Sequence, residues 1–166
     1  MWKPLWSEKK FVIKPELCIG CRSCELVCAY HHAGMVDINS AAISIYQFSD
    51  ASAIVPMLCM QCDEPECIKV CHNHAISKCE QSGVVTIDDA KCIKCNSCLH
   101  ACPFGNIRSS VTLGRQIKCD QCGGDPQCQK VCPVGAIDFV DSDDLCVDTI
   151  QLPAAKSLVK SEGAEV

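Results

Sequence analysis

Four groups of four cysteines constrain this chain more than any other feature of its 166 residues. These quartets contain sixteen of the 18 cysteines. They are Cys18-x2-Cys21-x2-Cys24-x3-Cys28, Cys59-x2-Cys62-x4-Cys67-x3-Cys71, Cys92-x2-Cys95-x2-Cys98-x3-Cys102 and Cys119-x2-Cys122-x5-Cys128-x3-Cys132. The first and third share one spacing, whereas the second and fourth have a longer gap between their second and third cysteines. A pattern that recurs four times predicts a fold built around metal sites.

The spacing is typical of cubane iron–sulfur sites. A C-x2-C-x2-C loop curls so that three thiolates converge, and backbone N–H groups that point at the sulfurs stabilise the negative cluster. The fourth cysteine lies past a helical turn and, in two-cluster ferredoxins, binds the other cluster. Sixteen thiolates are what four [4Fe–4S] clusters need. Zinc ribbons pair only two C-x2-C elements, so zinc does not explain four complete quartets.

The composition agrees with a metal-built interior. Aromatic residues make up only 5% of the chain, so a core of large side chains would be thin. We therefore expect the clusters to serve as the core and their loss to unfold the protein. Each oxidised cluster with its thiolates adds about −2, which takes the net charge from −5 to about −13 and disfavours nucleic acid as a partner. Arg22, Lys69, Lys94 and Lys130 lie near the quartets and are either local counter-charges or solvated surface residues.

The chain shows no sign of export or of membrane insertion. Residues 1–15 contain no apolar run of signal-peptide length and no twin arginine, and no stretch approaches the roughly 18 apolar residues of a membrane span. We expect a reducing, cytoplasmic setting. The alternative is export of this chain in complex with a partner that carries the signal for both chains.

An internal repeat organises the chain. Short runs rich in Val, Ile and Phe flank the quartets and predict strands at 11–13, 53–55, 84–87, 116–117, 106–108 and 136–140. Single helical turns are expected before each fourth cysteine, at 25–27, 68–70, 99–101 and 129–131. Each unit is thus strand, cluster loop, helical turn and strand, and two units make one bacterial ferredoxin-like fold. The predicted fold class is α+β, with two fused ferredoxin-like halves and little regular secondary structure.

The predicted domain covers residues 11–140, and residues 1–10 and 141–166 lie outside the repeat. Trp2, Leu5 and Trp6 suit either a partner interface or packing on the domain's own surface. The tail from residue 141 is either a frayed end or an arm along a partner. The longest gap between quartets, residues 29–58, is expected to wrap one half.

From Cys18 to Val140 the chain resembles the four-cluster ferredoxin-like subunits of dimethyl sulfoxide reductase, formate dehydrogenase and hydrogenase complexes. In that family the first and fourth quartets form one half, and the second and third form the other. The resemblance implies the following ligand sets, named here as sites 1 to 4. Site 1 is Cys18, Cys21, Cys24 and Cys132; site 2 is Cys28, Cys119, Cys122 and Cys128; site 3 is Cys59, Cys62, Cys67 and Cys102; site 4 is Cys71, Cys92, Cys95 and Cys98.

Two details refine the resemblance. The compact loop 119–128 and the segment 58–65 look more like the small subunits that accompany tungsten-pterin aldehyde oxidoreductases and benzoyl-CoA reductases. Proline commonly follows the fourth cysteine in the family, but Ala29 and His72 follow it in the first two quartets. Proline at that position shields a cluster from water. Its replacement by Ala29 and His72 therefore leaves open how far two of the clusters are exposed to water.

The predicted function is electron transfer without a catalytic site of its own. Such a subunit would connect a catalytic oxidoreductase subunit, of the tungsten- or molybdenum-pterin aldehyde oxidoreductase type, to a ferredoxin or a flavin or NAD partner. The alternatives are a free polyferredoxin, the iron–sulfur subunit of a hydrogenase or molybdopterin reductase, and a redox sensor, although no attached signalling segment favours the last. Copies with clusters at both ends could also stack end to end.

The remaining candidate side chains are expected to be structural. Cys79 and Cys146 are predicted to be small buried hydrophobes. The histidines are expected not to be ligands, because thiolates fill every cluster position; they are His31, His32, His72, His74 and His100. His72 has a second interpretation, as a hydrogen-bond donor to a cluster sulfur.

Overall fold

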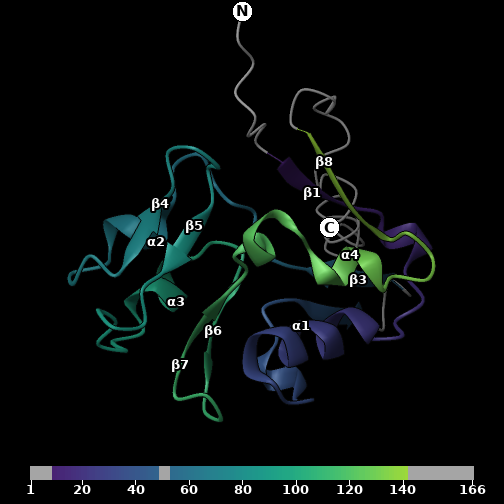
Figure 1. The fold of residues 1–166 in the computed structure, drawn as a ribbon, viewed down its shortest axis with the longest axis horizontal. Helices are drawn as coiled ribbons and strands as arrows, with labels where there is room; N and C mark the ends of the chain where they lie inside the picture. The colour runs from purple at the N-terminus through teal and green to yellow at the C-terminus, as the bar shows by residue number, and fades with distance from the viewer. Residues whose placement is uncertain (1–8, 49–52, 142–166) are drawn as a thin grey trace, which may run out of the picture.

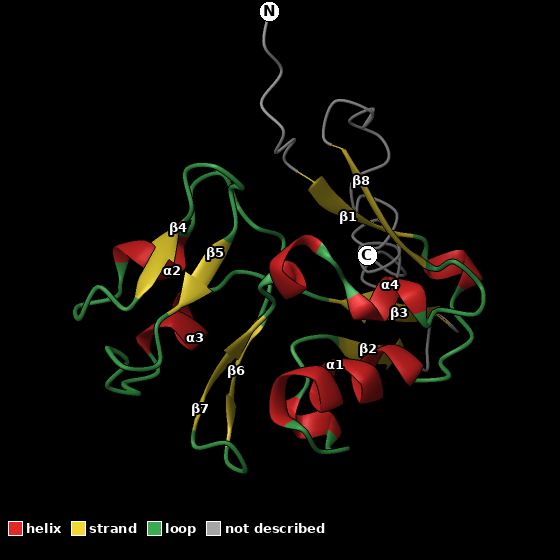
Figure 2. Ribbon diagram, viewed as in Figure 1, coloured by secondary structure: helices red, strands yellow, loops and turns green. Residues whose placement is uncertain are grey.

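The structure is a computed structural model that describes residues 9–48 and 53–141. Within these ranges the regular elements are short strands and helices (Figure 2). The strands are β1 (Lys9–Ile13), β2 (Ser44–Phe48), β3 (Ala53–Met57), β4 (Ile76–Lys78), β5 (Val85–Ile87), β6 (Ile107–Ser110), β7 (Arg115–Lys118) and β8 (Ile137–Asp141). The α-helices are α1 (Ser23–Ala33), α2 (Glu66–Lys69), α3 (Ser97–Ala101) and α4 (Gln127–Lys130). Short 3-10 turns lie at Pro15–Leu17, Ile38–Ser40 and Gln121–Gly124.

The strands form four separate antiparallel pairs. Three pairs join consecutive strands, β2 with β3, β4 with β5 and β6 with β7. The fourth pair joins β1 to β8, which lie at the two ends of the described chain (Figure 1). Phe11 faces Phe139 across this pair with ring centroids 4.9 Å apart. The ladder therefore brings the surroundings of the first quartet to those of the fourth.

The predicted mixture of short strands and helical turns is confirmed. Each predicted strand corresponds to an observed one within a few residues, whereas β2 and β4 were not expected. The largest difference is α1, which has 11 residues where the repeat predicts a single turn. Pro103 and Pro133 follow the last cysteines of the third and fourth quartets, and a proline at that place would break a helix. Ala29 allows α1 to continue past Cys28.

Two groups of buried side chains form the interior, and cysteines belong to both. The first core includes Phe11, Ile13, Ile43, Ile117 and Ile137 together with cysteines of the first and fourth quartets and Cys59. The second core is smaller and consists of Ile76, Val85 and Ile107 with Cys67 and Cys98. In Figure 1, α2, α3, β4 and β5 lie to one side, and α1, α4, β1 and β8 lie to the other.

The segment between the first two quartets packs against the first core. It supplies Ala29, Ala41, Ala42, Ile43 and Leu58 to that core. Ala29 and Ala41 are fully buried. The absence of proline after Cys28 thus does not open this position to water, because α1 and its neighbours cover Ala29.

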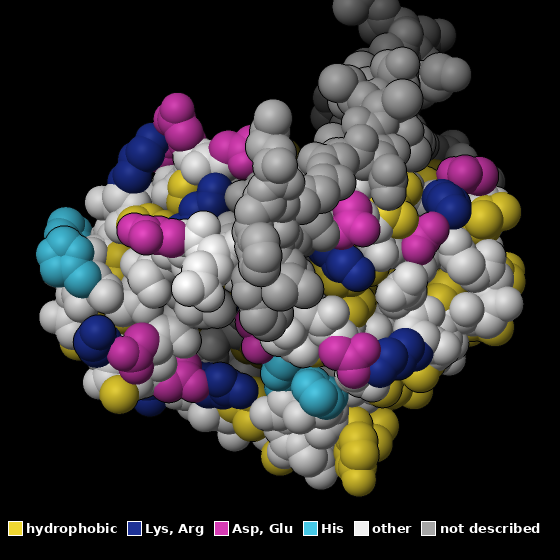
Figure 3. Space-filling view, turned by 45° about the horizontal axis from the view of Figure 1, so that its top comes forward, with side chains coloured by type: hydrophobic (Ala, Val, Ile, Leu, Met, Phe, Trp, Pro, Cys, Tyr) yellow, Lys and Arg dark blue, Asp and Glu magenta, His cyan; other side chains and the backbone are white. Residues whose placement is uncertain are grey.

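Charge on the visible surface is mixed. In Figure 3 the basic side chains lie among acidic ones, without a single large basic patch on the face shown. The ion pairs Lys69–Glu66 and Lys130–Asp125, both 2.7 Å or less, are examples. Among the described residues, no helix is both long enough and apolar enough to cross a bilayer.

Candidate metal centres

Three cavities are each lined by four quartet cysteines. The cavity of site 1 contains Cys18, Cys21, Cys24 and Cys132. The cavity of site 3 contains Cys59, Cys62, Cys67 and Cys102, and that of site 4 contains Cys71, Cys92, Cys95 and Cys98. Each cavity takes three cysteines from one quartet and the last cysteine of another. Cysteines that are far apart in the sequence are thereby brought to the same place.

The cysteines of site 2 also lie close enough to influence one another. Burial is the main cause that raises the pKa of Cys128 to about 12, and the charges of Cys28 and Cys122 add to it. Burial likewise raises the pKa of Cys119 well above its ordinary value, with Cys128 and Cys28 among the contributing charges. The fourth cysteine of the first quartet thus lies beside three cysteines of the fourth quartet.

The loop between the first two cysteines has the same backbone feature in every quartet. The residue before the second cysteine has a left-handed conformation each time; these residues are Gly20, Gln61, Lys94 and Gln121. In the fourth quartet this turn lets the N–H of Gln121 donate to the sulfur of Cys119, at 3.4 Å. A hydrogen bond from Gly20 likewise lowers the pKa of Cys18, although burial, the larger effect, raises it. The turn directs backbone N–H groups toward sulfur.

The fourth cysteine of each quartet accepts a backbone hydrogen bond. Cys28 accepts from the N–H of Ala42, at 3.2 Å. The other three accept from the residue four positions later: Ala75 to Cys71 at 3.2 Å, Asn106 to Cys102 at 3.4 Å and Ala136 to Cys132 at 3.3 Å. In these three quartets the residue before the donor has a positive φ, and these residues are His74, Gly105 and Gly135. The same turn thus presents one N–H to sulfur in three quartets.

We expect Gly135→Ala to weaken the fourth-quartet turn. Gly135 has a φ of +65°, and an added Cβ would meet nothing within 4 Å, so the cost comes from the backbone alone. A left-handed L-residue costs about 1 to 2 kcal/mol, and asparagine tolerates this conformation better. Gly135→Ala should therefore lose its cluster absorbance at a lower guanidinium concentration, and Gly135→Asn should lie nearer to the wild type. Equal midpoints for Ala and wild type would contradict this role of the turn.

The donor sets fit iron–sulfur clusters. Each set consists of four thiols, which are soft ligands suited to iron–sulfur clusters or zinc. At sites 1, 3 and 4 the four thiols line a small cavity of about 20 Å³ each. The N–H groups directed at the sulfurs also suit a bound group with negative charge.

Exposed thiols occur in two of the four sites. Cys21 of site 1 and Cys95 of site 4 are exposed, and hydrogen bonding with Ser23 and Ser97 lowers the pKa of each. Cys59, Cys119 and Cys128, of sites 2 and 3, are buried. The exposed thiols of the quartets therefore belong to sites 1 and 4.

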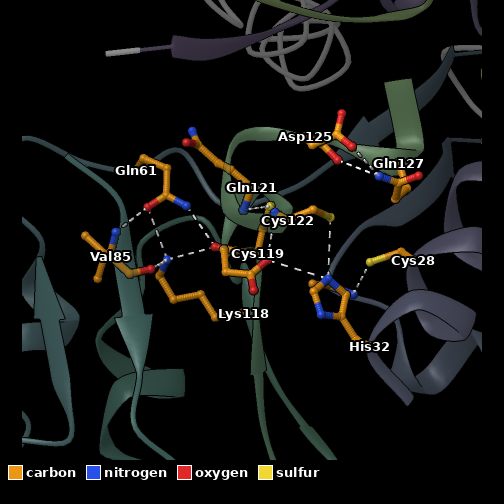
Figure 4. Close-up of polar contacts among 12 residues, drawn as sticks. Cys28, His32, Gln61, Val85, Lys118, Cys119, Gln121, Cys122, Asp125 and Gln127 are labelled. Carbon is orange, nitrogen blue, oxygen red and sulfur yellow. Dashed lines mark hydrogen bonds and ion pairs between the residues drawn. The ribbon is translucent and has the colours of Figure 1, made fainter. Parts of the chain in front are cut away.

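A polar network connects the loops of the second and fourth quartets (Figure 4). The amide of Gln61 donates to the carbonyl of Cys119 at 2.8 Å and accepts from the N–H of Val85 at 2.9 Å. The ammonium of Lys118 donates to Gln61 Oε1 at 3.3 Å and to the carbonyls of Val85 and Cys119. Sequence reasoning missed Lys118, because no local pattern indicates that it contacts residues 33 and 57 positions away.

Of the histidines, His32 lies against a candidate ligand. Its Nε2 lies 3.6 Å from the sulfur of Cys122 and 3.5 Å from a carboxylate oxygen of Asp120. Burial lowers the pKa of His32, although Asp120 acts in the opposite direction. His72 is exposed, and no hydrogen bond to a sulfur is found for it among the described residues.

Several other expectations have different outcomes. Cys79 was expected to be buried, which is wrong: it is exposed in the turn between β4 and β5, where a hydrogen bond from Ser82 lowers its pKa. Arg22 and Lys94 line the cavities of sites 1 and 4, whereas Lys69 and Lys130 pair with carboxylates. Cys146, Trp2, Leu5 and Trp6 lie outside the described residues, as do positions 142–166.

Comparisons with known proteins agree with this geometry. A family model described as a 4Fe-4S dicluster domain matches residues 51–142, and one described as a 4Fe-4S binding domain matches residues 15–31. The polyferredoxin-like subunit of the aliphatic sulfonate oxidoreductase of Pyrococcus furiosus is 35% identical over 73% of this chain and 69% of its own length. One component of the anaerobic dimethyl sulfoxide reductase of Escherichia coli is 32% identical over 81% of this chain and 74% of its own length.

One solved structure covers nearly the whole chain. A polypeptide in the active site complex BamBC of benzoyl coenzyme A reductase matches with a TM-score of 0.50 and 25% sequence identity. The match covers 94% of this chain and 93% of that polypeptide. The resemblance to a benzoyl-CoA reductase subunit, expected from loop 119–128, is thereby confirmed.

Proposed function

Since this chain belongs to the 4Fe-4S dicluster family, we propose that it holds four [4Fe–4S] clusters and transfers electrons between a catalytic subunit and a second redox partner. It is an iron–sulfur electron-transfer subunit without a catalytic site of its own, as its relatives are named as iron–sulfur or polyferredoxin-like subunits and other components of oxidoreductases. A cluster in each site supplies one-electron transfer. The polypeptide provides the thiols, the N–H donors and the shielding from water.

The observation that carries this proposal is the three-plus-one composition of the cavities. Each of sites 1, 3 and 4 combines three cysteines of one quartet with the fourth cysteine of another. The mutual influence of Cys28, Cys119 and Cys128 supports the same composition for site 2. This exchange of the last ligand is the arrangement of two-cluster ferredoxins. It supports two ferredoxin-like halves within residues 11–140, one with sites 1 and 2 and the other with sites 3 and 4.

The sites are arranged in the order 1, 2, 3, 4. The charge of Cys24 in site 1 contributes to the raised pKa of Cys128 in site 2, after burial and nearer thiols. The charge of Cys59 in site 3 likewise contributes to the raised pKa of Cys119 in site 2. Cysteines of sites 3 and 4 share the second core. An order with two inner and two outer sites suits a conductor that receives electrons at one end and delivers them at the other.

The outer sites have the surface that a redox partner needs. Ile19 and Ile93 follow the first cysteines of their quartets and are 61% and 64% exposed. They lie beside the exposed Cys21 and Cys95 in the linings of sites 1 and 4. One end would contact the catalytic subunit and the other a ferredoxin or flavoprotein, and two copies stacked end to end would use the same surfaces.

The partner's chemistry is proposed from resemblance. The compact fourth-quartet loop favours a tungsten- or molybdenum-pterin oxidoreductase of the aldehyde oxidoreductase type, working in the cytoplasm. The match to a polypeptide of an active site complex of benzoyl coenzyme A reductase supports a place beside a catalytic subunit. The second candidate is a free polyferredoxin, which the polyferredoxin-like name of the Pyrococcus furiosus relative favours.

Purification from the host under anaerobic conditions tests both parts of the proposal. We expect about sixteen iron atoms on this chain, four per site. We also expect a catalytic subunit with tungsten or molybdenum to co-purify. About four zinc ions and no iron would overturn the cluster assignment. Unchanged co-purification after deletion of residues 1–10 and 147–166 would contradict a role of the ends in binding the partner, whereas the absence of any partner would favour the free carrier.

A further inference from the structure

Lys118 holds a positive charge at the junction between sites 2 and 3. It is the last residue of β7 and directly precedes Cys119 of site 2. Its half-buried side chain lines the cavity of site 3 together with Val85. One cation thus lies next to the first ligand of one site and within the wall of another (Figure 4).

The ammonium is held in place by neutral oxygens. Its three N–H groups face Gln61 Oε1 at 3.3 Å, the carbonyl of Cys119 at 3.1 Å and the carbonyl of Val85. No carboxylate forms an ion pair with Lys118 among the residues that the structure describes. Gln61 is itself buried and held from both sides by Cys119 and Val85. The charge is therefore oriented without being cancelled.

Three other cations near the quartets differ from Lys118 in this respect. Lys69 is exposed on α2 and pairs with Glu66 and Glu64, and Lys130 pairs with Asp125. Arg22 is exposed and lies 3.8 Å from Glu25. Because an oppositely charged neighbour and water both weaken the field of a charge, these side chains act less strongly on a buried site.

We propose that Lys118, positioned by Gln61, raises the reduction potential at site 3 and, to a lesser extent, at site 2. This inference rests on the proposed function. Reduction adds one negative charge to a cluster, and a fixed cation in a half-buried wall stabilises the reduced form. Lys118 lines the same cavity as the site 3 thiols of Cys59 and Cys67, so its charge lies beside that cluster site. Gln61 is the positioning residue, and the charge of Lys118 favours the reduced form of the cluster at the junction between sites 2 and 3.

The test is an anaerobic redox titration of the full iron-loaded chain, followed by electron paramagnetic resonance. The site 3 signal is assigned by its loss in a Cys62→Ala variant. Lys118→Met should lower its midpoint potential by at least 59 mV, a tenfold change in a one-electron equilibrium. Lys118→Arg should restore most of the shift, because it keeps the charge. Lys69→Met is the matched control, since it removes a paired, exposed lysine near Cys67, and its midpoints should equal those of the wild type.

Three outcomes would overturn the inference. The first is an unchanged midpoint in Lys118→Met with its iron retained. The second is an equal shift in Lys118→Arg and Lys118→Met, which indicates a structural effect. The third applies if Lys118→Met loses iron. The Gln61→Glu variant then takes its place, because Glu has a similar shape and puts a carboxylate against the ammonium. An unchanged midpoint potential of site 3 in Gln61→Glu would contradict the inference. A wild-type chain that contains zinc and no iron would instead refute the proposed function.

Discussion

Replacing Cys132 with alanine should abolish the cluster held by Cys18, Cys21 and Cys24, and should spare the one held by Cys119, Cys122 and Cys128. Cys132 lines the cavity of site 1, and its charge adds to burial in raising the pKa of Cys18. The iron content should fall from about sixteen to about twelve atoms, and one paramagnetic signal should vanish. The substitution therefore lies in the fourth quartet, whereas the cluster that is lost is held mainly by the first quartet.

Two pairs of variants make this result decisive. Cys132→Ala and Cys18→Ala should lose the same signal, because both belong to site 1. Cys128→Ala and Cys28→Ala should both lose a different signal, because both belong to site 2. Cys128 lies on α4, and Cys132 follows this helix closely. Local unfolding there would affect both cysteines, so it cannot alone explain why the two variants lose different signals. A result in which Cys132→Ala groups with Cys128→Ala would contradict the exchange of ligands.

Removal of iron should unfold the chain. Cysteines belong to both hydrophobic cores, and four quartet cysteines line each of three cavities. A cluster bound there would link segments that are distant in the sequence. Folded domains are stable by only about 5 to 15 kcal/mol, whereas a structural metal supplies on the order of 10 kcal/mol per site. Anaerobic chelation should therefore abolish the far-ultraviolet circular dichroism of the strands and helices and make the chain sensitive to protease.

The control for this experiment is the return of the metal. Thiols must be kept reduced throughout, so that disulfides do not trap the unfolded chain. Addition of iron and sulfide should restore both the visible absorbance and the circular dichroism. An iron-free chain with native circular dichroism and protease resistance would show that the apolar residues, led by Phe11, Ile13 and Leu58, suffice without clusters.

The repeated elements could be predicted from the sequence, and the elements outside the repeat could not. Strands beside the quartets consist of Val and Ile next to turn residues, which is why β1, β5 and β8 were expected. The helix α1 was expected to be short because the helical turn of one repeat unit was assumed, whereas Ala29 lets it continue and Gly34 ends it as a left-handed C-cap. Cys79 was misjudged because the usual burial of cysteine does not apply where the chain enters an exposed hairpin turn.

The groups of cysteines follow from spacing and resemblance, but the polar residues between them depend on tertiary contacts. Lys118 acquires its role only when Gln61 and Val85, from distant loops, surround its ammonium. His32 approaches Cys122 because α1 continues beyond Cys28 and packs near the fourth quartet. Neither contact leaves a local pattern, so neither could be predicted from the chain alone.

The antiparallel pair of β1 and β8 determines the order in which a nascent chain can mature. A ribosome that has released residue 102 has delivered every cysteine lining the cavities of sites 3 and 4. The strand β1, although it is made earlier, must wait for β8 at the other end of the described chain, and the cavity around Cys18 must wait for Cys132. The cellular machinery that loads iron therefore meets the cysteines of sites 3 and 4 first, and the cavity of site 1 closes only after Cys132 and β8 have been made.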